Sequence, residues 1–250
     1  MSLRDTISTP AGKAPFVRRL FSTIADRYDL ITVLLSYGQD RRWKRRLIDL
    51  AGALEGRIVL DLACGTGDIA CLAAGRGARV TGLDVTPRMI DLARRKATRR
   101  FAIGGAEAPP PQLPFRSPSF VVGDMMALPF PDQSVDIVTT GYGLRNVPVI
   151  GDAIAEIRRV LRPGGRLVSL DFNRPLSPPV RLAYHTYLTV VGSALGLALH
   201  GNPDTYRYIP ESIRRYPDAD QVAFLLRSAG FESARWERVL GGLMAIHVAQ

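Results

Sequence analysis

Short apolar runs alternate with amphipathic runs along most of this chain. Runs rich in Val, Ile and Leu that are bounded by Gly, Pro or charged residues predict buried strands. The strands that we expect are 58–62, 79–84, 119–123, 135–140, 166–172, 231–240 and 243–249. Apolar residues at helical spacing predict helices at 68–75, 87–99, 149–161 and 219–229. This alternation predicts an α/β fold with a doubly wound, seven-stranded sheet, and Gly241-Gly242 predicts an antiparallel C-terminal hairpin at its edge.

The segments outside this alternation suggest how the chain is divided. Residues 1–14 are polar, and we expect a disordered tail there without the apolar core of a signal peptide. Residues 15–56 predict an N-terminal helical cap, because apolar side chains recur at helical spacing. Residues 57–250 form the main domain, with a Gly-, Ala- and Pro-rich flexible loop at 101–118 and a lid segment at 174–217.

Composition narrows the choice of partners. The 250 residues carry a formal net charge of +10, and most of the excess comes from arginine. A basic surface suits anionic lipid or nucleic acid. Because no nucleic-acid-binding motif accompanies it, we expect a cytoplasmic protein with either a peripheral contact with anionic membrane or a solvated basic surface. The apolar stretch 182–199 is interrupted by glycines and polar residues, and we expect it to be too short and mixed to cross a membrane.

The two cysteines have no predicted role in chemistry. Cys64 and Cys71 have the spacing of neither a zinc site nor a redox pair, and we expect two reduced packing thiols. No other group of His, Cys and acidic residues has metal-ligand spacing, so we expect no metal.

Candidate chemistry centres on the turn after the first predicted strand. Gly65 and Gly67 let the backbone approach a ligand closely at a helix N-terminus. With Asp84 one strand later they satisfy the dinucleotide fingerprint. Asp61 and Asp68 favour a different ligand, because like charges about 4 Å apart repel by roughly 4 kcal/mol at an effective dielectric of about 20. A ligand with a sulfonium and an ammonium group would suit both acids, so S-adenosylmethionine is the preferred cofactor.

The ends of the next strands supply further candidates for this cofactor. Asp84 can accept two hydrogen bonds from a ribose diol. Asp124 can accept a hydrogen bond from the adenine N6 amine, while Met125 packs on the ring. Gly141 ends the fourth strand and leaves room for the methionyl part.

The most specific motifs extend beyond the glycine turn. They are Tyr28-Asp29, Gly65-Thr66-Gly67-Asp68, Leu128-Pro129-Phe130-Pro131, Gly143-Leu144-Arg145-Asn146-Val147 and Arg162-Pro163-Gly164-Gly165. Together they cover the chain from about residue 16 onward, and the chain resembles the quinone-biosynthesis C-methyltransferases. Members of that family methylate demethylmenaquinol, 2-polyprenyl-6-methoxybenzoquinol or 2-phytyl-naphthoquinol. The chain departs from the family pattern at Ile31, Thr32 and Asp40, where that pattern usually has Met-Asn and a histidine.

The resemblance implies a class I S-adenosylmethionine-dependent methyltransferase. Its cofactor contacts would fall on Thr66, Asp84, Asp124, Met125 and Gly141. The acidic glycine turn adds Asp61, Gly65 and Gly67 to this set.

The resemblance also places an acceptor ring beyond the fourth strand. Arg145 and Asn146 would either face this ring or cap the following loop, and Arg145 could stabilise a developing phenolate. The proton could go to Asp29, to Tyr142 or to a bound water, and the sequence does not choose among them.

Substrate binding is expected in the predicted cap and lid. Segments 15–40 and 180–217 would cover the ring and the first isoprene units, with the substrate contacts Tyr28, Tyr206, Tyr208 and Arg215. The favoured reaction converts demethylmenaquinol to menaquinol. Methylation of another small molecule or lipid, and a non-catalytic assembly protein with the same fold, are the alternatives; a homodimer stays open.

Overall fold

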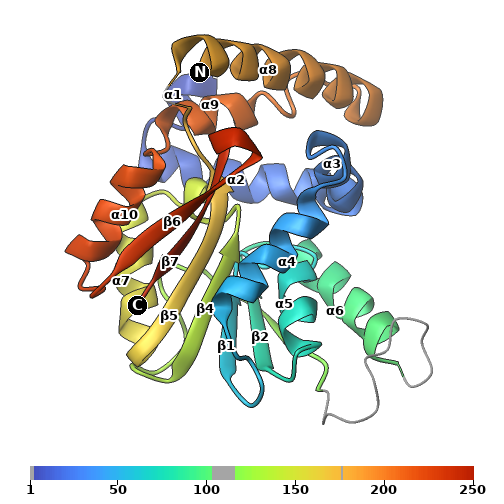
Figure 1. The fold of residues 1–250 in the computed structure, drawn as a ribbon. Helices are drawn as coiled ribbons and strands as arrows, with labels where there is room; N and C mark the ends of the chain where they lie inside the picture. The colour runs from blue at the N-terminus through green and yellow to red at the C-terminus, as the bar shows by residue number, and fades with distance from the viewer. Residues whose placement is uncertain (1–2, 103–115, 176) are drawn as a thin grey trace.

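One mixed sheet organises the computed structural model, which describes residues 3–102, 116–175 and 177–250. Its strands follow the order β3-β2-β1-β4-β5-β7-β6 (Figure 1). All neighbours pair in parallel except β7, which runs antiparallel to both β5 and β6. The strands are β1 (Ile58–Leu62), β2 (Arg79–Asp84), β3 (Ser119–Val122), β4 (Val135–Gly141), β5 (Leu161–Phe172), β6 (Ala234–Val239) and β7 (Met244–Ala249). The predicted seven-stranded sheet with its C-terminal hairpin is confirmed.

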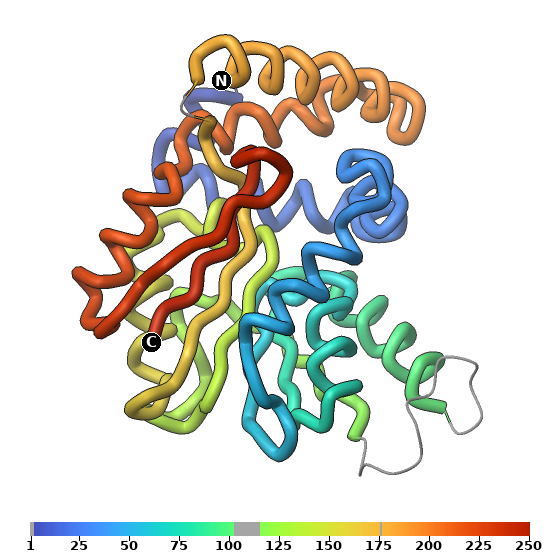
Figure 2. Tube along the Cα trace, in the orientation of Figure 1, coloured from blue at the N-terminus to red at the C-terminus, as the bar shows by residue number. Residues whose placement is uncertain are grey.

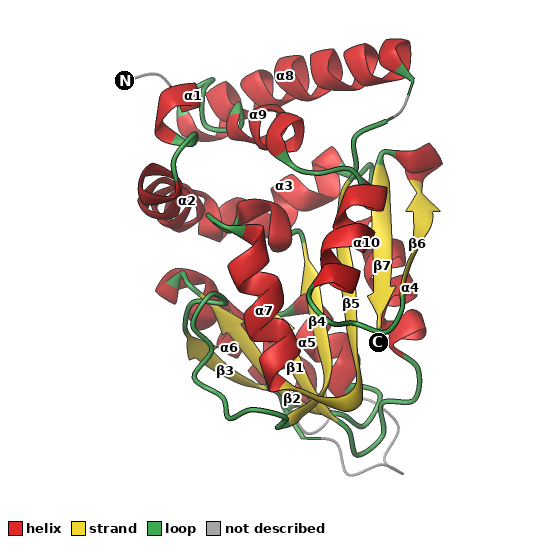
Figure 3. Cartoon of the chain, turned by 90° about the vertical axis from the view of Figure 1, so that its left-hand side faces the viewer, coloured by secondary structure: helices red, strands yellow, loops and turns green. Residues whose placement is uncertain are grey.

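Helices cover both faces of this sheet, which explains why its central strands are apolar on both sides. On one face α4 (Asp40–Ala51), α5 (Asp68–Ala74) and α6 (Pro87–Phe101) pack on Val59, Ile137 and Val168. On the other face, α7 (Ile150–Val160) and α10 (Ala219–Ser228) pack on Leu60, Val138 and Leu167. Figure 3 shows α7 and α10 on the second face.

The two ends of the chain meet in a helical layer above the sheet. Figure 2 shows the N-terminal segment beside the segment that follows β5. Ile24 and Ile31 form a buried cluster with Tyr206, while Ile7 and Val17 form another with Tyr208. The elements of this layer are α1 (Leu3–Thr6), α2 (Pro10–Ile24), η1 (Ala25–Arg27), α3 (Tyr28–Leu35), α8 (Pro178–His200) and α9 (Tyr208–Arg215). The remaining short turns are η2 (Leu144–Asn146) and η3 (Leu240–Gly242).

The described part of the predicted disordered tail, residues 3–14, instead forms α1 and the beginning of α2, joined by a turn at 7–9. Ile7 is buried against the helical layer, and the side chain of Thr9 accepts a hydrogen bond from the Gly12 amide and caps α2. Pro10 occupies the first turn of α2, where its missing N–H costs nothing. The prediction failed because the apolar partners of Ile7 lie in other elements.

Other boundaries differ locally from the prediction. Strand β5 begins at Leu161, which pairs with Val135 across a register shift. Helix α6 includes Phe101, and residues 103–115 of the predicted flexible loop lie outside the described residues. Cys64 and Cys71 are buried free thiols, as predicted.

Helix α8 is longer than the apolar stretch that predicts it. Its 23 residues make it long and apolar enough to cross a membrane by length and composition, contrary to expectation. Only 22% of its most apolar window is buried within the protein. Much of its surface therefore has no partner within the described chain.

Candidate active site

A cleft lies at the carboxyl ends of β1, β2, β3 and β4, beneath α2. This is the point where the sheet order reverses, and ligands of open α/β sheets bind there. Its empty space is about 760 Å³, including the open mouth. Residues from all four strand ends line the cleft, together with residues of α2 and α3. The lining includes Ala14, Val17, Arg18, Phe21, Tyr28, Ala63, Gly65, Asp84, Thr86, Met89, Gly123, Asp124, Met125, Gly141, Tyr142, Gly143 and Asn146.

Asp84 is the buried carboxylate of this cleft. Its two oxygens accept hydrogen bonds from the backbone amides of Gly65 and Thr86, at 2.9 and 2.8 Å. Burial raises the pKa of Asp84, whereas these two backbone hydrogen bonds act in the opposite direction. Asp84 therefore fixes the glycine turn, and each oxygen keeps a lone pair for a diol.

Asp124 and Met125 line the same cleft, as the sequence predicts. The Met126 amide donates to Asp124 Oδ1 at 2.9 Å, and this turn presents the carboxylate beside the Met125 side chain. Among the described residues, the charged side chains that line the cleft are the carboxylates Asp84 and Asp124 and the guanidinium of Arg18. This set fits a nucleoside with a positively charged end and disfavours a pyrophosphate.

The other two acids of the glycine turn face away from the cleft. Asp61 is fully buried and accepts hydrogen bonds from the Ala70 amide and the Thr139 hydroxyl, at 3.0 and 2.8 Å. Burial raises its pKa to about 7. Asp68 pairs with Lys44 and Lys96 instead of a ligand. Asp61 is therefore a support for the turn, and the charge contrast predicted from Asp61 and Asp68 is wrong: Asp84 and Asp124 provide it.

The glycines serve packing as well as ligand approach. Gly67 has φ of +84°, and a Cβ there would lie 2.9 Å from the Phe120 ring. A Cβ on Gly141 would lie 2.7 Å from Ile69 Cδ1. Gly141 lines the cleft, but the space left by its missing side chain is taken by Ile69 rather than by a ligand.

A second, apolar cavity opens beside the cofactor cleft. It encloses about 960 Å³ of empty space, open solvent included, between the helical layer and the end of β5. Its walls are aromatic and aliphatic side chains from both ends of the chain: Leu20, Phe21, Ile24, Tyr28, Ile31, Leu35, Tyr37, Trp43, Phe172, Tyr184, Tyr187, Tyr206, Tyr208, Ile209, Leu240, Leu243 and Met244. Phe21, Tyr28, Tyr142 and Asn146 line both spaces. A flat ring seated at this junction would face the cofactor cleft.

Arg145 lines the apolar cavity although it is almost completely buried. Its guanidinium group lies 3.4 Å from Asp171, donates to the Ser212 hydroxyl and sits 4.8 Å from the centre of the Phe172 ring. The Arg145 amide also donates to Asp171, at 3.0 Å. These contacts fix a cation at the wall of the cavity.

Asn146 makes the loop contacts of one of the two roles that the sequence leaves open, and its place fits the other. Its amide nitrogen donates to the Tyr142 carbonyl at 2.7 Å, and its oxygen accepts from the Tyr208 hydroxyl at 3.0 Å. It holds the loop and also lines both spaces. Burial raises the pKa of Tyr28 and of Tyr208 to about 12, so both are neutral donors at physiological pH.

Besides Asp61, the predicted residues Gly67, Thr66, Asp29 and Arg215 line neither of these spaces. Thr66 donates to Asp29 at 2.6 Å, and Asp29 also pairs with Lys96; Asp29 lines a separate polar pocket. Arg215 donates to the Arg4 carbonyl and lines neither the cleft nor the apolar cavity. The structure therefore separates Asp29 and Arg215 from the expected acceptor ring.

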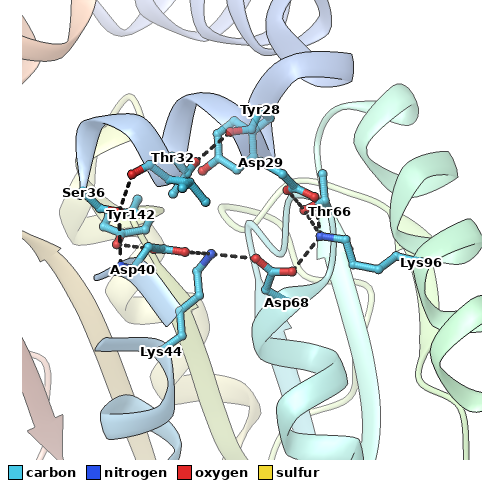
Figure 4. Close-up of polar contacts among 11 residues, drawn as sticks. Tyr28, Asp29, Thr32, Ser36, Asp40, Lys44, Thr66, Asp68, Lys96 and Tyr142 are labelled. Atoms are coloured by element: carbon cyan, nitrogen blue, oxygen red, sulfur yellow. Dashed lines mark hydrogen bonds and ion pairs between the residues drawn. The ribbon is translucent and has the colours of Figure 1, made fainter. Parts of the chain in front are cut away.

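A polar network behind the junction is absent from the sequence-based expectations. The Tyr142 hydroxyl donates to Asp40 at 2.7 Å, and Asp40 lies 2.5 Å from Lys44 (Figure 4). Lys44 also lies 2.9 Å from Asp68. Although burial opposes it, the ammonium groups of Lys44 and Lys96 hold the pKa of Asp68 below its ordinary value. The i,i+4 spacing of Asp40 and Lys44 was the available signal, hidden within a basic run that suggested a solvated face.

No metal centre accompanies this site in the described ranges 3–102, 116–175 and 177–250. No three His, Cys, Asp or Glu side chains gather there in a way that could hold an ion.

Comparisons with known proteins agree with this geometry. The model of the ubiE/COQ5 methyltransferase family matches residues 9–250. A demethylmenaquinone methyltransferase of Thermus thermophilus is 43% identical over 92% of this chain and 98% of its own length. The ubiquinone/menaquinone biosynthesis C-methyltransferase UbiE of Salmonella arizonae is 37% identical over 94% of this chain and 90% of its own.

Solved structures share the fold at lower identity. Magnesium protoporphyrin IX methyltransferase from Synechocystis, solved with bound SAH, has a TM-score of 0.64 at 18% identity, covering 94% of this chain and 98% of its own. A SAM-dependent methyltransferase from Aquifex aeolicus has a TM-score of 0.55 at 17% identity, covering 82% and 88%. The predicted methyltransferase fold and its cofactor, S-adenosylmethionine, are confirmed.

Proposed function

Because the chain belongs to the ubiE/COQ5 methyltransferase family, we propose that it methylates a ring carbon of a polyprenylated quinol. The observation that carries this proposal is the junction between the charged cofactor cleft and the apolar cavity. A quinol ring at Tyr142 and Asn146 would meet the methyl donor, while its tail would lie among aliphatic side chains.

The residues of the chain suit each part of such a reaction. When bound, S-adenosylmethionine supplies an electrophilic methyl group. Asp84 and Asp124 would hold its ribose and adenine, and the junction residues would align the ring. Good alignment can remove roughly 7–11 kcal/mol of barrier. Arg145, fixed by Asp171, would stabilise the negative charge that develops on the ring oxygen.

Demethylmenaquinol is the acceptor that we favour. The Thermus thermophilus relative named for demethylmenaquinone shares 43% identity and nearly its whole length with this chain. The departures at Ile31, Thr32 and Asp40 border the apolar cavity or its wall, so they bear on the choice of quinol. Another methyl acceptor and a non-catalytic role stay alternatives.

A direct assay tests this function. Purified protein is incubated with methyl-labelled S-adenosylmethionine and with reduced demethylmenaquinone or 2-polyprenyl-6-methoxybenzoquinol, and labelled quinone is separated by chromatography. We expect label on the naphthoquinone ring. Calorimetry with S-adenosylmethionine separates the alternatives: no binding supports a non-catalytic protein, whereas binding without quinol methylation supports another acceptor. Accumulation of a demethyl quinone in cells lacking the gene would identify the substrate independently.

We also propose that the protein works in the cytoplasm while resting on the inner face of the membrane that holds its acceptor. Helix α8 exposes Leu182, Val190 and Leu197 by 70, 63 and 60%. Arg174, Arg181 and Arg214 line a shallow pocket at the N-terminal end of the same helix. Exposed apolar side chains beside basic ones suit an anionic lipid surface.

Vesicle flotation tests this contact. We expect binding to phosphatidylglycerol vesicles, weaker binding to phosphatidylcholine vesicles, and loss of binding in Leu182→Asp. Phe224→Asp is the matched control, because Phe224 is 62% exposed but lies on α10. Equal binding to both vesicles, or equal loss in both variants, would contradict a contact through α8.

A further inference from the structure

Tyr142 occupies the wall between three spaces. It lines the cofactor cleft and the apolar cavity, and its hydroxyl donates to Asp40. Asp40 lines a third, polar pocket that also contains Lys44 and Asp68. The Tyr142–Asp40 hydrogen bond therefore connects the acceptor junction to a pocket that opens to solvent (Figure 4).

Tyr142 has a strained backbone, and its neighbours hold it in the conformation that makes this connection. Its φ is +62°, a conformation that costs a bulky residue of the order of 1–3 kcal/mol. Hydrogen bonds on both sides hold it there: its amide donates to the Leu170 carbonyl at 2.7 Å, and its carbonyl accepts from Asn146 at 2.7 Å. The side chain also packs on Phe172, with ring centres 5.7 Å apart. Strain that the surroundings enforce is typical of functional positions.

Asp40 is a buried carboxylate that lines the polar pocket. It is 3% exposed, and the Lys44 ammonium lies 2.5 Å from Oδ2 while Tyr142 occupies Oδ1. An ion pair of this kind offsets the cost of burying the charge. Beyond Lys44 the charges alternate through Asp68, Lys96 and Asp29, at 2.9, 2.6 and 2.6 Å. Three carboxylates thus share two ammonium groups, so one carboxylate can take up a proton while the other two keep an ammonium partner each. Arg41, Arg45, Arg99 and Arg100 line the same pocket.

We propose that Asp40, acting through the Tyr142 hydroxyl, accepts the proton that the acceptor ring releases on methylation. The inference rests on the proposed function, since it assigns the base of that same reaction. Of the three candidates that the sequence leaves open, Asp29 lines only the polar pocket and is tied to Thr66 and Lys96. Tyr142 lies at the junction itself.

The ring carbon forms its bond to the methyl group as the sulfur–methyl bond breaks, with the electron pair left on sulfur. The ring hydroxyl, made acidic by this loss of electron density, gives its proton to Tyr142 Oη, and Tyr142 gives its own proton to Asp40. The hydrogen on the methylated carbon then moves to the ring oxygen and restores the aromatic ring. One proton remains on Asp40 and leaves through the polar pocket.

Two single variants and their combination test the proposal. We expect Tyr142→Phe and Asp40→Asn each to lower kcat by about 100-fold or more, the range in which general bases act. The double variant should lose no more than the worse single variant, since both residues serve one proton path. Cofactor affinity, measured by calorimetry, should stay within about twofold of the wild type, because neither variant removes Asp84 or Asp124. A tenfold loss of affinity, about 1.4 kcal/mol, would mean that the variants disturb the cofactor cleft.

The pH profile distinguishes proton acceptance from a structural role. Wild-type kcat should fall as the pH decreases, because only the carboxylate form of Asp40 can accept a proton. In the Asp40→Asn variant this fall at low pH, the acid limb of the profile, should be absent. The titratable or charged groups nearest to Asp40 are Tyr142 after β4, Lys44 on α4, Tyr28 on α3 and, through Lys44, Asp68 on α5. The same pocket is also lined by Asp29 on α3, Arg41 and Arg45 on α4, and Lys96, Arg99 and Arg100 on α6. Asp49→Asn is the matched control, because Asp49 lies on α4 too but pairs with Arg76 at the surface.

Several outcomes would overturn the inference. They are single variants with near-normal kcat and an unchanged acid limb, losses that multiply in the double variant, or a raised KM with kcat unchanged. If the single variants unfold early in thermal melts, the milder variant Asp40→Glu is measured instead, because it keeps the carboxylate. A pH profile of kcat with the shape and rate of the wild type supports the proposal. Loss of the acid limb in this variant contradicts it. A wild-type protein that binds S-adenosylmethionine but methylates no quinol would instead refute the proposed function.

Discussion

The cofactor cleft and the apolar cavity share a wall, yet they are built in different ways. The cleft gathers residues that follow directly on the strand ends, such as Gly65, Thr86, Asp124 and Gly143. The cavity gathers Leu20 and Ile31 from the beginning of the chain and Tyr206 and Ile209 from near its end. The first is held by backbone hydrogen bonds within one sheet, and the second by apolar packing between helices.

This difference implies a separation of roles. Hydrogen bonds to a buried carboxylate are directional, so the cleft should tolerate few changes and should determine cofactor affinity. Apolar contacts are non-directional and scale with area, so the cavity should tolerate changes and should set affinity for the acceptor. Variants of Asp84, Arg145 and Leu35 test this separation, and a variant of Lys13 tests how the helical layer is held to the site.

The largest effect should come from Asp84→Ala. Loss of this carboxylate leaves the Gly65 and Thr86 amides without their partners and would remove the proposed ribose contact. Since hydrogen bonds to charged groups contribute about 1.5–3 kcal/mol each, we expect the Kd for S-adenosylmethionine to rise about 100-fold or more. Calorimetry measures this Kd. The Asp84→Asn variant should lose less cofactor affinity, because asparagine keeps the shape of the aspartate side chain. A Kd close to the wild-type value in Asp84→Ala would contradict the assignment.

Arg145→Ala should separate turnover from cofactor binding. Removing the cation at the cavity wall should lower kcat by about 10²–10³ while leaving the Kd for S-adenosylmethionine nearly unchanged. Arg145→Lys should recover part of the rate because it keeps the charge. Equal losses of cofactor affinity in the Arg145 and Asp84 variants would show that the two spaces do not have separate roles.

A change inside the apolar cavity should act on the acceptor alone. Leu35 lines the cavity, and Leu35→Asp places a charge where the isoprenoid tail is expected. We expect the KM for a prenylated quinol to rise about tenfold, the value of one or two buried methylene groups, and the KM for a tail-less analogue to stay unchanged. Leu34→Asp, on the outer side of α3, is the control. Equal effects on both acceptors would place the tail elsewhere.

The smallest effect should be on stability. Lys13 on α2 donates to the carbonyls of Arg145 and Val147, at 3.0 and 2.7 Å, and ties the helical layer to the site. Burial, followed by the nearby Arg145 charge, lowers its pKa from 10.5 to about 8. Between these values the unfolded state binds more protons than the folded state, so this lysine's contribution to the free energy of unfolding rises with pH.

Urea denaturation at two pH values measures this contribution. The free energy of unfolding of the wild type relative to Lys13→Met should increase from pH 7.5 to pH 10. Subtracting Lys13→Met removes the titration of the other lysines and tyrosines. A difference that is constant or decreasing over this range would show that Lys13 is not buried at the loop.

The way each part is built also explains which predictions succeeded. Strand ends are local features, so the sequence identified Asp84, Asp124 and Met125 from their positions after apolar runs, and all three line the cleft. Asp61, within β1, and Asp68, at the start of α5, flank the glycine turn but point away from the cleft, because Thr139 and Lys44 offer them partners from other elements. A motif shows which residues lie near a turn, whereas neighbouring strands and helices determine where each side chain points.

What the sequence alone determined about this protein is therefore the sheet, its hairpin, the glycine turn and the family to which the motifs belong. Periodicity and turn chemistry depend on residues close together in the chain, and they survive without knowledge of the fold. The tertiary structure decided the rest: the layer formed by both chain ends, the apolar cavity and the Tyr142–Asp40 connection. Asp40 and Tyr142 are 102 positions apart, and only packing of α4 against the sheet brings their side chains within 2.7 Å.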